Sequence, residues 1–100
     1  MSQGQTQIKE RQNTRQREPR RYKVMILNDD LTPMEFVVHI LETVFFKSAE
    51  EAEAIMLTAH REERALVGIY SYDIAKSKVE RAMEMSRSQK YPLQLTYMPE

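Results

Sequence analysis

A predicted strand that runs directly into a predicted helix is the feature that most constrains the fold. Residues 22–27 are β-rich and stop at the Asn-Asp-Asp run over 28–30, which indicates a strand closed by a turn. Thr32, Pro33 and Glu35 then have the spacing of a helix start. Thr32 would be the N-cap, Pro33 the first helical residue and Glu35 the partner in a capping box. The helix is expected to bury an apolar stripe made of Phe36, Val37, Ile40, Leu41, Val44 and Phe45.

Further elements follow along the chain. Ser48 and Glu51 form a second capping box, which opens another helix. Gly68 lies inside a later β-rich run, where a glycine suggests a β-bulge or a close approach of the backbone. The sequence therefore predicts a helix from residue 48 to about 63, a strand over 64–70, a helix within 71–90 and a strand over 93–97.

The order β-α-α-β-α-β predicts a small two-layer α+β domain, in which a three-stranded antiparallel sheet packs on three helices. We place this core domain at residues 22–100 and a flexible, disordered N-terminal extension at residues 1–21. The extension holds one large aliphatic residue besides the initiator, Ile8, so it cannot bury enough apolar surface to fold. A core of this size buries only about 60–65% of its extended-chain surface. Any ligand must therefore be met at the surface.

Charge is spread unevenly along the chain. Residues 1–21 carry six Lys/Arg and two Asp/Glu, whereas the remaining residues carry nine and thirteen. An acidic core is a poor candidate for nucleic-acid binding, which needs basic patches, so only a weak contact of the extension with RNA stays open. Apolar runs are shorter than the roughly 18 residues of a membrane span, and a signal-peptide core is lacking. We expect a cytoplasmic protein without nucleic-acid or membrane partners.

The sequence offers little support for catalysis or for a cofactor. The chain contains no cysteine, which excludes disulfides and the usual zinc ligand sets. Its serines, histidines and aspartates stand in no recognisable catalytic motif. His39 and His60 fall on different predicted helices, and Asp29 and Asp30 lack the spacing of a calcium loop. We therefore expect neither an enzyme nor a bound metal or cofactor.

The polar residues at 28–30 allow two interpretations. In the first they form only a turn, because Asx residues favour turns and acids before a helix complement its dipole. In the second they belong to a binding site, because three consecutive polar residues exceed what a turn needs if Thr32 already caps the helix. The residues alone leave both interpretations open.

His60 would complete such a binding site. A histidine at a helix end more often satisfies the last carbonyls, and methionines at helical positions more often fill the core. If that helix end lies beside Asn28 and Asp29, however, an amide, a carboxylate and an imidazole converge. Such a rim beside an apolar hollow suits an ammonium next to an apolar side chain, as at a peptide N-terminus. The hollow would be lined by Met34, Val37, Met56 and Ala59.

Three segments of the chain resemble the ClpS family of protease adaptors: YKVMILNDDLTPMEFVV from residue 22, IMLTAHREERALVGIYSYDIAKSKV from residue 55 and YPLQLTY from residue 91. The resemblance covers about residues 20–98. It implies an N-end rule adaptor, not an enzyme, that binds N-terminal Leu, Phe, Tyr or Trp of N-degron substrates. It also implies delivery of those substrates to the ClpA-type AAA+ unfoldase of the ClpAP protease, and we expect a monomer.

The resemblance assigns roles to particular residues. It implies that Asn28, Asp29 and His60 hold the substrate α-amino group. It implies that Asp73 and Lys78 dock on the N-domain of the unfoldase. The residues that it places at the side-chain pocket are Asp30 and Leu31 at the entrance, Met34 as a gate, and Thr32, Val37, Met56, Ala59 and Leu93.

Two residues depart from the family pattern. Glu63 stands where many members have a glycine, and Glu adopts a left-handed turn less readily than Gly, so we expect the loop after His60 to differ. Ala59 replaces an expected valine, which should enlarge the pocket.

The same order of elements also resembles the C-terminal domain of the ribosomal stalk protein, so a generic protein-interaction module is the alternative function.

Overall fold

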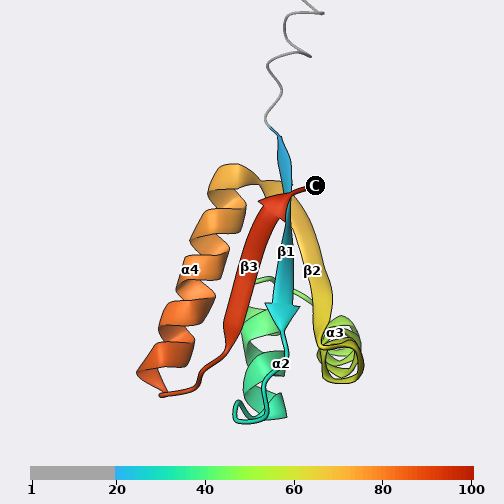
Figure 1. Cartoon of the computed structure of the whole chain (residues 1–100), viewed down its shortest axis with the longest axis vertical. Helices are drawn as coiled ribbons and strands as arrows, with labels where there is room; N and C mark the ends of the chain where they lie inside the picture. Colours follow the sequence, from blue (N-terminus) through green and yellow to red (C-terminus); the bar gives the residue numbers. More distant parts are fainter. Residues whose placement is uncertain (1–19) are drawn as a thin grey trace, which may run out of the picture.

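Residues 20–100, described from a computed structural model, form three strands and three helices in the predicted order (Figure 1). The predicted flexible extension falls almost entirely on residues 1–19, which lie outside the described residues. The first strand begins at Arg21, one residue earlier than predicted. The elements are β1 (Arg21–Leu27), α2 (Met34–Thr43), α3 (Ala49–Glu62), β2 (Arg64–Ser71), α4 (Tyr72–Ser88) and β3 (Gln94–Pro99).

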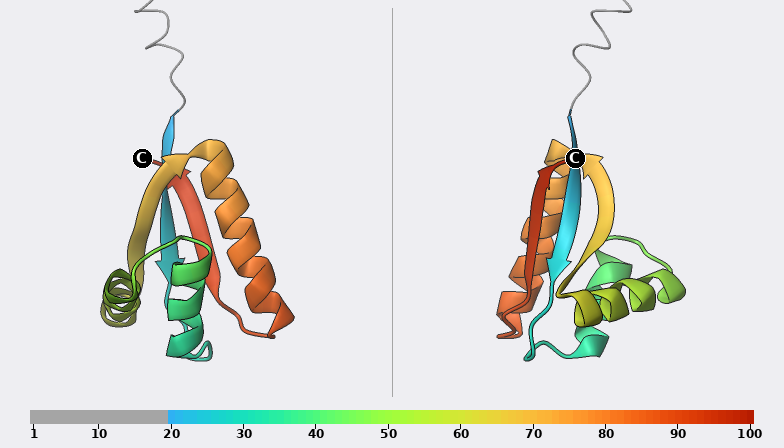
Figure 2. Two further views of the ribbon diagram at one scale, coloured as in Figure 1. Left: turned by 180° about the vertical axis from the view of Figure 1, so that it is seen from behind. Right: turned by 45° about the vertical axis from the view of Figure 1, so that its right-hand side comes forward.

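The sheet has the strand order β2-β1-β3, and both outer strands run antiparallel to β1. One face of it is buried through alternating residues such as Val24, Ile26 and Leu95, and α4 packs against all three strands. Figure 1 shows the strands in front of α2, and the reverse view in Figure 2 shows α2 in front of the strands. The α+β fold predicted from the sequence is confirmed.

The apolar stripe predicted for the first helix is buried, with one exception at its edge. Phe36 is only half-buried, and its ring packs edge-on against Tyr91 with 4.9 Å between centroids. The buried helix residues are Val37, Ile40 and Leu41 in α2, Ala52, Met56 and Ala59 in α3, and Ala75, Val79, Ala82 and Ser86 in α4.

Gly68 lies at a β-bulge, as its position in the strand predicts. Val24 pairs with Gly68 and Met25 pairs with Leu66, so Val67 is an extra residue on β2. A Cβ added at Gly68 would lie 2.7 Å from the hydroxyl oxygen of Tyr70. The glycine is therefore required by close packing of the tyrosine side chain against the bulged backbone.

The start of α2 differs from the prediction. Pro33, not Thr32, is the N-cap residue, and it makes no side-chain cap hydrogen bond. The Thr32 hydroxyl instead donates to Asp29 Oδ2 over 2.9 Å. The predicted capping box with Glu35 is therefore wrong, because the Thr32 hydroxyl is directed at the Asp29 carboxylate and not at the first N–H groups of the helix.

The start of α3 agrees with the prediction. The Ser48 hydroxyl accepts from the Glu51 backbone N–H at 3.1 Å, and Glu51 Oε1 accepts from the Ser48 N–H at 3.0 Å. The hydrogen bonds from the Ser48 backbone and side chain lower the pKa of Glu51 below its ordinary value. The capping box that the sequence predicts is confirmed.

Candidate functional site

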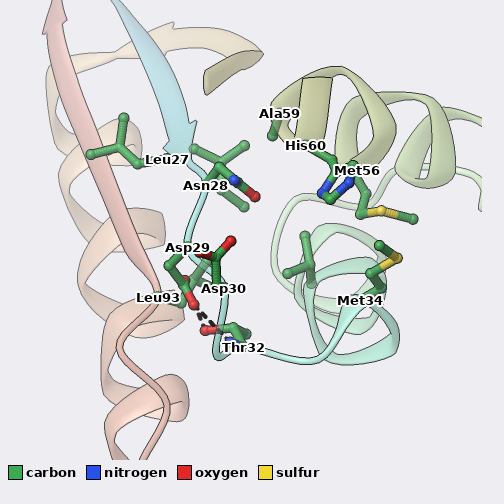
Figure 3. A pocket seen from close by; sticks show the side chains of 12 residues that line it. Leu27, Asn28, Asp29, Asp30, Thr32, Met34, Met56, Ala59, His60 and Leu93 are labelled. Carbon is green, nitrogen blue, oxygen red and sulfur yellow. Dashed lines mark hydrogen bonds between the residues drawn. The ribbon is translucent and has the colours of Figure 1, made fainter. Parts of the chain in front are cut away.

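One cavity lies where the end of β1 meets α2 and the last turns of α3 (Figure 3). Its volume is about 100 Å³. Its walls join segments more than 30 residues apart in the sequence, since they include Asn28 from the loop after β1 and His60 from α3. The residues that line it are Ile26, Leu27, Asn28, Asp29, Asp30, Thr32, Met34, Val37, Met56, Ala59, His60 and Leu93.

The end of α3 is tied to the loop after β1 by backbone hydrogen bonding. Leu27 pairs with Arg64 across the two strands, and the Asn28 N–H donates to the Glu63 carbonyl over 2.9 Å. Glu63 ends α3 in the left-handed conformation, with φ at 75°. The last turn of α3, which carries His60, is thereby held beside Asn28.

Glu63 therefore adopts the conformation that a glycine would favour at a helix C-terminus. That the loop after His60 differs from the loop of family members stays a prediction. A residue with a Cβ is disfavoured in the left-handed region by about 1–2 kcal/mol. The antiparallel pairing on one side and the helix on the other hold Glu63 in place despite that cost.

Asp29 has a structural role as well as a place in the cavity wall. Its Oδ1 accepts from the backbone N–H groups of Leu31 at 2.8 Å and Thr32 at 2.7 Å. Among residues 20–100, its Oδ2 accepts only from the Thr32 hydroxyl, which leaves one acceptor position on that oxygen for a ligand. The turn interpretation and the binding interpretation therefore apply to the same carboxylate.

Asn28 and His60 lie across the cavity from each other in Figure 3, and no hydrogen bond joins either side chain to another lining residue. Asn28 is half-buried, whereas His60 is exposed at the mouth. Together with Asp29 they provide an amide oxygen, a carboxylate oxygen and an imidazole nitrogen at one opening. Chemically, this arrangement can accept hydrogen bonds from a ligand with several donors.

The inner wall of the cavity is apolar. Val37, Met56, Ala59 and Leu93 are buried and face the space between the sheet and the helices. Met34 is half exposed, at 50%, and lies at the edge of the cavity beside Met56 (Figure 3). An apolar side chain of a ligand could replace water there, with Met34 over the opening.

Most of the residues expected around the pocket line this cavity, with one exception and two additions. Leu31 is 75% exposed and does not line the cavity, because the Asp29 turn directs it outward. Ile26 and Leu27 line it but were not singled out from the sequence. Their place as the last residues of a predicted strand, next to the polar turn, was the signal that could have identified them.

The two residues expected to dock an unfoldase lie elsewhere, on α4. Asp73 is exposed in the first turn of the helix. Lys78 Nζ donates to the Val44 carbonyl at 2.6 Å, and burial lowers the pKa of Lys78. Lys78 therefore also has an internal role, in which it ties α4 to the C-terminal end of α2.

Residues 20–100 contain no cluster of three or more His, Asp or Glu side chains placed to hold a metal ion. Within this range, no helix has both the length and the apolar character that crossing a membrane requires.

Comparison with known proteins gives consistent matches. The family model for the ATP-dependent Clp protease adaptor protein ClpS matches residues 17–96. The ClpS adapter of Gluconobacter oxydans is 49% identical over 80 residues, which is 80% of this chain and 67% of that protein. The ClpS adapter of Acetivibrio thermocellus is 45% identical over 95 residues, which is 95% of this chain and 96% of that protein.

A solved structure has the same fold. Agrobacterium tumefaciens ClpS2 bound to L-phenylalaninamide is 42% identical and superimposes with a TM-score of 0.81. The match covers 83% of this chain and all of that one, at 100%.

Proposed function

The chain belongs to the ClpS family of adaptors of the ATP-dependent Clp protease, and on that premise we propose that it recognises N-degrons. It would bind proteins whose first residue is Leu, Phe, Tyr or Trp and deliver them to a ClpA-type unfoldase. Its relatives are adaptors rather than enzymes. Membership of this family also decides against the stalk-protein resemblance as a guide to function.

The observation that carries the proposal is the meeting of Asn28, Asp29 and His60 at the mouth of an apolar cavity. A free α-amino group has a pKa near 8, so it is mostly an ammonium at neutral pH and offers three hydrogen-bond donors. The Asn28 oxygen, Asp29 Oδ2 and an unprotonated ring nitrogen of His60 would accept one bond each. His60 must be neutral for this, because imidazolium has no acceptor.

The ligand of the Agrobacterium relative supports this assignment. L-Phenylalaninamide has a free α-amino group, a benzyl side chain and a neutral amide. The amide stands in for the first peptide bond of a substrate, so the compound has the chemistry of a Phe-led peptide. For the present chain we propose the same orientation, with the amine at the polar rim and the side chain in the cavity.

The cavity wall would select the first side chain. Burial of a Leu or Phe side chain contributes roughly 1.5–3 kcal/mol. Met34 follows Pro33, whose ring fixes the backbone, so we propose that it acts as a gate against side chains branched at Cβ. The small Ala59 side chain would leave room for the larger aromatic residues.

Delivery would use a second surface on α4, at Asp73 and Lys78. We propose that both residues contact the N-domain of the unfoldase, while residues 1–21 form an extension to the core domain at residues 22–100. The adaptor would work as a cytoplasmic monomer.

In a pull-down with a ClpA-type unfoldase, Asp73→Asn should weaken unfoldase binding without changing peptide affinity. This substitution leaves the internal hydrogen bond of Lys78 intact.

Fluorescence anisotropy with short peptides that differ only in their first residue tests substrate recognition. Peptides that begin with Leu, Phe, Tyr or Trp should bind, and those that begin with Val or Ile should not. An acetylated Leu-led peptide is the matched control. Acetylation removes the charge and two donors, which leaves acceptors unpaired at about 1–3 kcal/mol each. Equal binding of the free and acetylated peptides would contradict the proposed function.

A further inference from the structure

Phe46, just beyond α2, combines two unfavourable features. The residue is 79% exposed, and its backbone is left-handed, with φ at 57°. The left-handed region is a genuine outlier for a bulky side chain, and an exposed ring contributes little to the core. Gly or Asn would take this conformation more readily. The left-handed turn ends α2, where the Lys47 N–H donates to the Leu41 carbonyl over 3.0 Å, but that turn does not need an aromatic ring. An exposed ring kept at a strained position therefore calls for a role of the ring itself.

The ring is held in position from the side of α4. Lys78 Nζ lies 4.5 Å from the centroid of the Phe46 ring, within the range of a cation–π interaction. The same ammonium group donates to the Val44 carbonyl over 2.6 Å and is partly desolvated. Because Lys78 has a fixed partner, it orders the aromatic ring that lies against it.

A shallow hollow adjoins the ring between α2 and α4. It is lined by two cations, Lys78 and Arg81, and by no carboxylate. The other lining residues are Thr43, Val44, Phe46 and Ser77. Phe and Arg are among the residue types that are enriched at protein interfaces. The charges here complement a partner surface with an apolar pocket and an acidic rim.

We propose that Phe46 is the apolar anchor of the adaptor on its unfoldase, with its ring in an apolar pocket of the partner's N-domain. Lys78 and Arg81 pair with carboxylates at the rim of that pocket. This inference rests on the proposed delivery function, and it adds a residue and a partner chemistry to the surface at Asp73 and Lys78.

Two substitutions test the binding role of the Phe46 ring separately from the backbone strain at this position. Phe46→Gly and Phe46→Asn both remove the ring and suit a left-handed backbone. Both variants should unfold at a higher temperature than the wild type. Both should bind a purified ClpA-type unfoldase at least tenfold more weakly in surface plasmon resonance. A gain in stability together with a loss of binding is not expected of a residue that serves folding alone.

Two controls accompany these variants. Leu57→Ala removes an apolar side chain that is 44% exposed on α3 and should leave unfoldase binding unchanged. Affinity for a Leu-led peptide, measured by anisotropy, should be the same in all three variants and the wild type. Arg81→Gln should weaken unfoldase binding and reduce its dependence on salt, as expected for a charge at an interface rim.

The outcomes distinguish this inference from the proposal beneath it. If Phe46→Asn binds the unfoldase as tightly as the wild type, the anchor role is overturned while delivery stands. If the wild type binds Leu-led peptides but not the unfoldase, both delivery and the anchor are overturned. If the Phe46 variants lose unfoldase binding and keep peptide binding, the anchor is supported.

Discussion

The starts of α2 and α3 use polar side chains in different ways. At α3, Ser48 and Glu51 hydrogen-bond to each other's backbone N–H groups, so their polar atoms are used within the helix start. At α2, Thr32 turns away from the helix and donates to Asp29 instead. The first arrangement stabilises a helix, and the second fixes a carboxylate at the mouth of a cavity.

The difference shows that the usual N-capping pattern is absent at the helix start that adjoins the cavity. A helix start that follows the capping pattern needs no further explanation, because its donors are satisfied locally. A start that gives up its side-chain cap needs a compensating interaction, and such exceptions are expected at functional positions. Here the Thr32 hydroxyl bonds to Asp29 instead of capping the helix, and Asp29 lies in the wall of the cavity.

The largest expected effect is at Asp29. Asp29→Asn keeps an oxygen that can accept the turn hydrogen bonds but removes the charge, so we predict more than tenfold weaker binding of a Leu-led peptide. The loss corresponds to about 1.5–3 kcal/mol for a charge-assisted hydrogen bond. Anisotropy measures it, and circular dichroism checks that the fold is retained. Unchanged affinity would mean that the carboxylate serves only the turn.

A change of selectivity should follow at Met34. With Met34→Ala the proposed gate is shortened, and we predict that Val- and Ile-led peptides gain about tenfold in affinity, in the range of small steric changes in apolar pockets. Met34→Leu, which keeps an apolar side chain of similar size, is the control and should retain the selectivity. If Met34→Ala leaves the order of the peptides unchanged, Met34 is not a gate.

The contrast between the two helix starts is tested by paired substitutions. Ser48→Ala should lower the free energy of unfolding by about 1 kcal/mol, the usual effect of losing an N-cap, and leave peptide affinity unchanged. Thr32→Val removes the hydroxyl that orients Asp29 and should weaken peptide binding. Chemical denaturation and anisotropy on both variants provide the comparison. Weaker peptide binding by Ser48→Ala, or unchanged peptide binding by Thr32→Val, would contradict the contrast between the two helix starts.

A smaller effect of opposite sign is expected at the end of α3. Glu63→Gly should raise the free energy of unfolding by about 0.5–1 kcal/mol, because it relieves a left-handed residue at some cost in chain entropy. Glu63→Gln keeps the backbone cost and removes only the charge, so it should not stabilise the protein when both variants are compared with the wild type by thermal denaturation. Equal stability of the two variants would show that φ at this position carries no penalty.

The smallest expected effect is the dependence of the α3 capping box on pH. Hydrogen bonds from Ser48 lower the pKa of Glu51 below its ordinary value of 4.5. A lowered pKa in the folded state means that the ionised carboxylate adds stability above that ordinary value. The contribution is lost as the pH falls through the lowered pKa. The stability difference between wild type and Glu51→Ala should therefore shrink in acid, and a difference that grows there would contradict the assignment.

Local patterns were sufficient to predict much of the fold. The capping box at Ser48, the bulge at Gly68 and the apolar stripe of α2 follow from interactions within a few residues or from strand and helix periodicity. Thr32 was predicted wrongly because the sequence offers its hydroxyl two partners, the helix N-terminus and the Asp29 carboxylate. The spacing of residues alone does not decide between them.

Contacts between distant segments were harder to predict. Lys78 donates to the carbonyl of Val44, 34 residues away, and no sequence pattern selects a backbone partner at that range. The position of His60 opposite Asn28 depends on the register of β1 with β2 and on the left-handed Glu63. From the sequence, Asn28 and His60 were therefore expected to converge only if the end of that helix lay beside the Asn-Asp turn. The structure places the two residues at one cavity.

A crystal structure of the protein with a Leu- or Phe-led dipeptide tests the central claim most directly. The account predicts the ligand nitrogen about 2.7–3.2 Å from an oxygen of Asn28, an oxygen of Asp29 and a ring nitrogen of His60. The first side chain should lie against Val37, Met56 and Leu93. A dipeptide whose amine points into solvent, or that binds at another surface, would contradict the account.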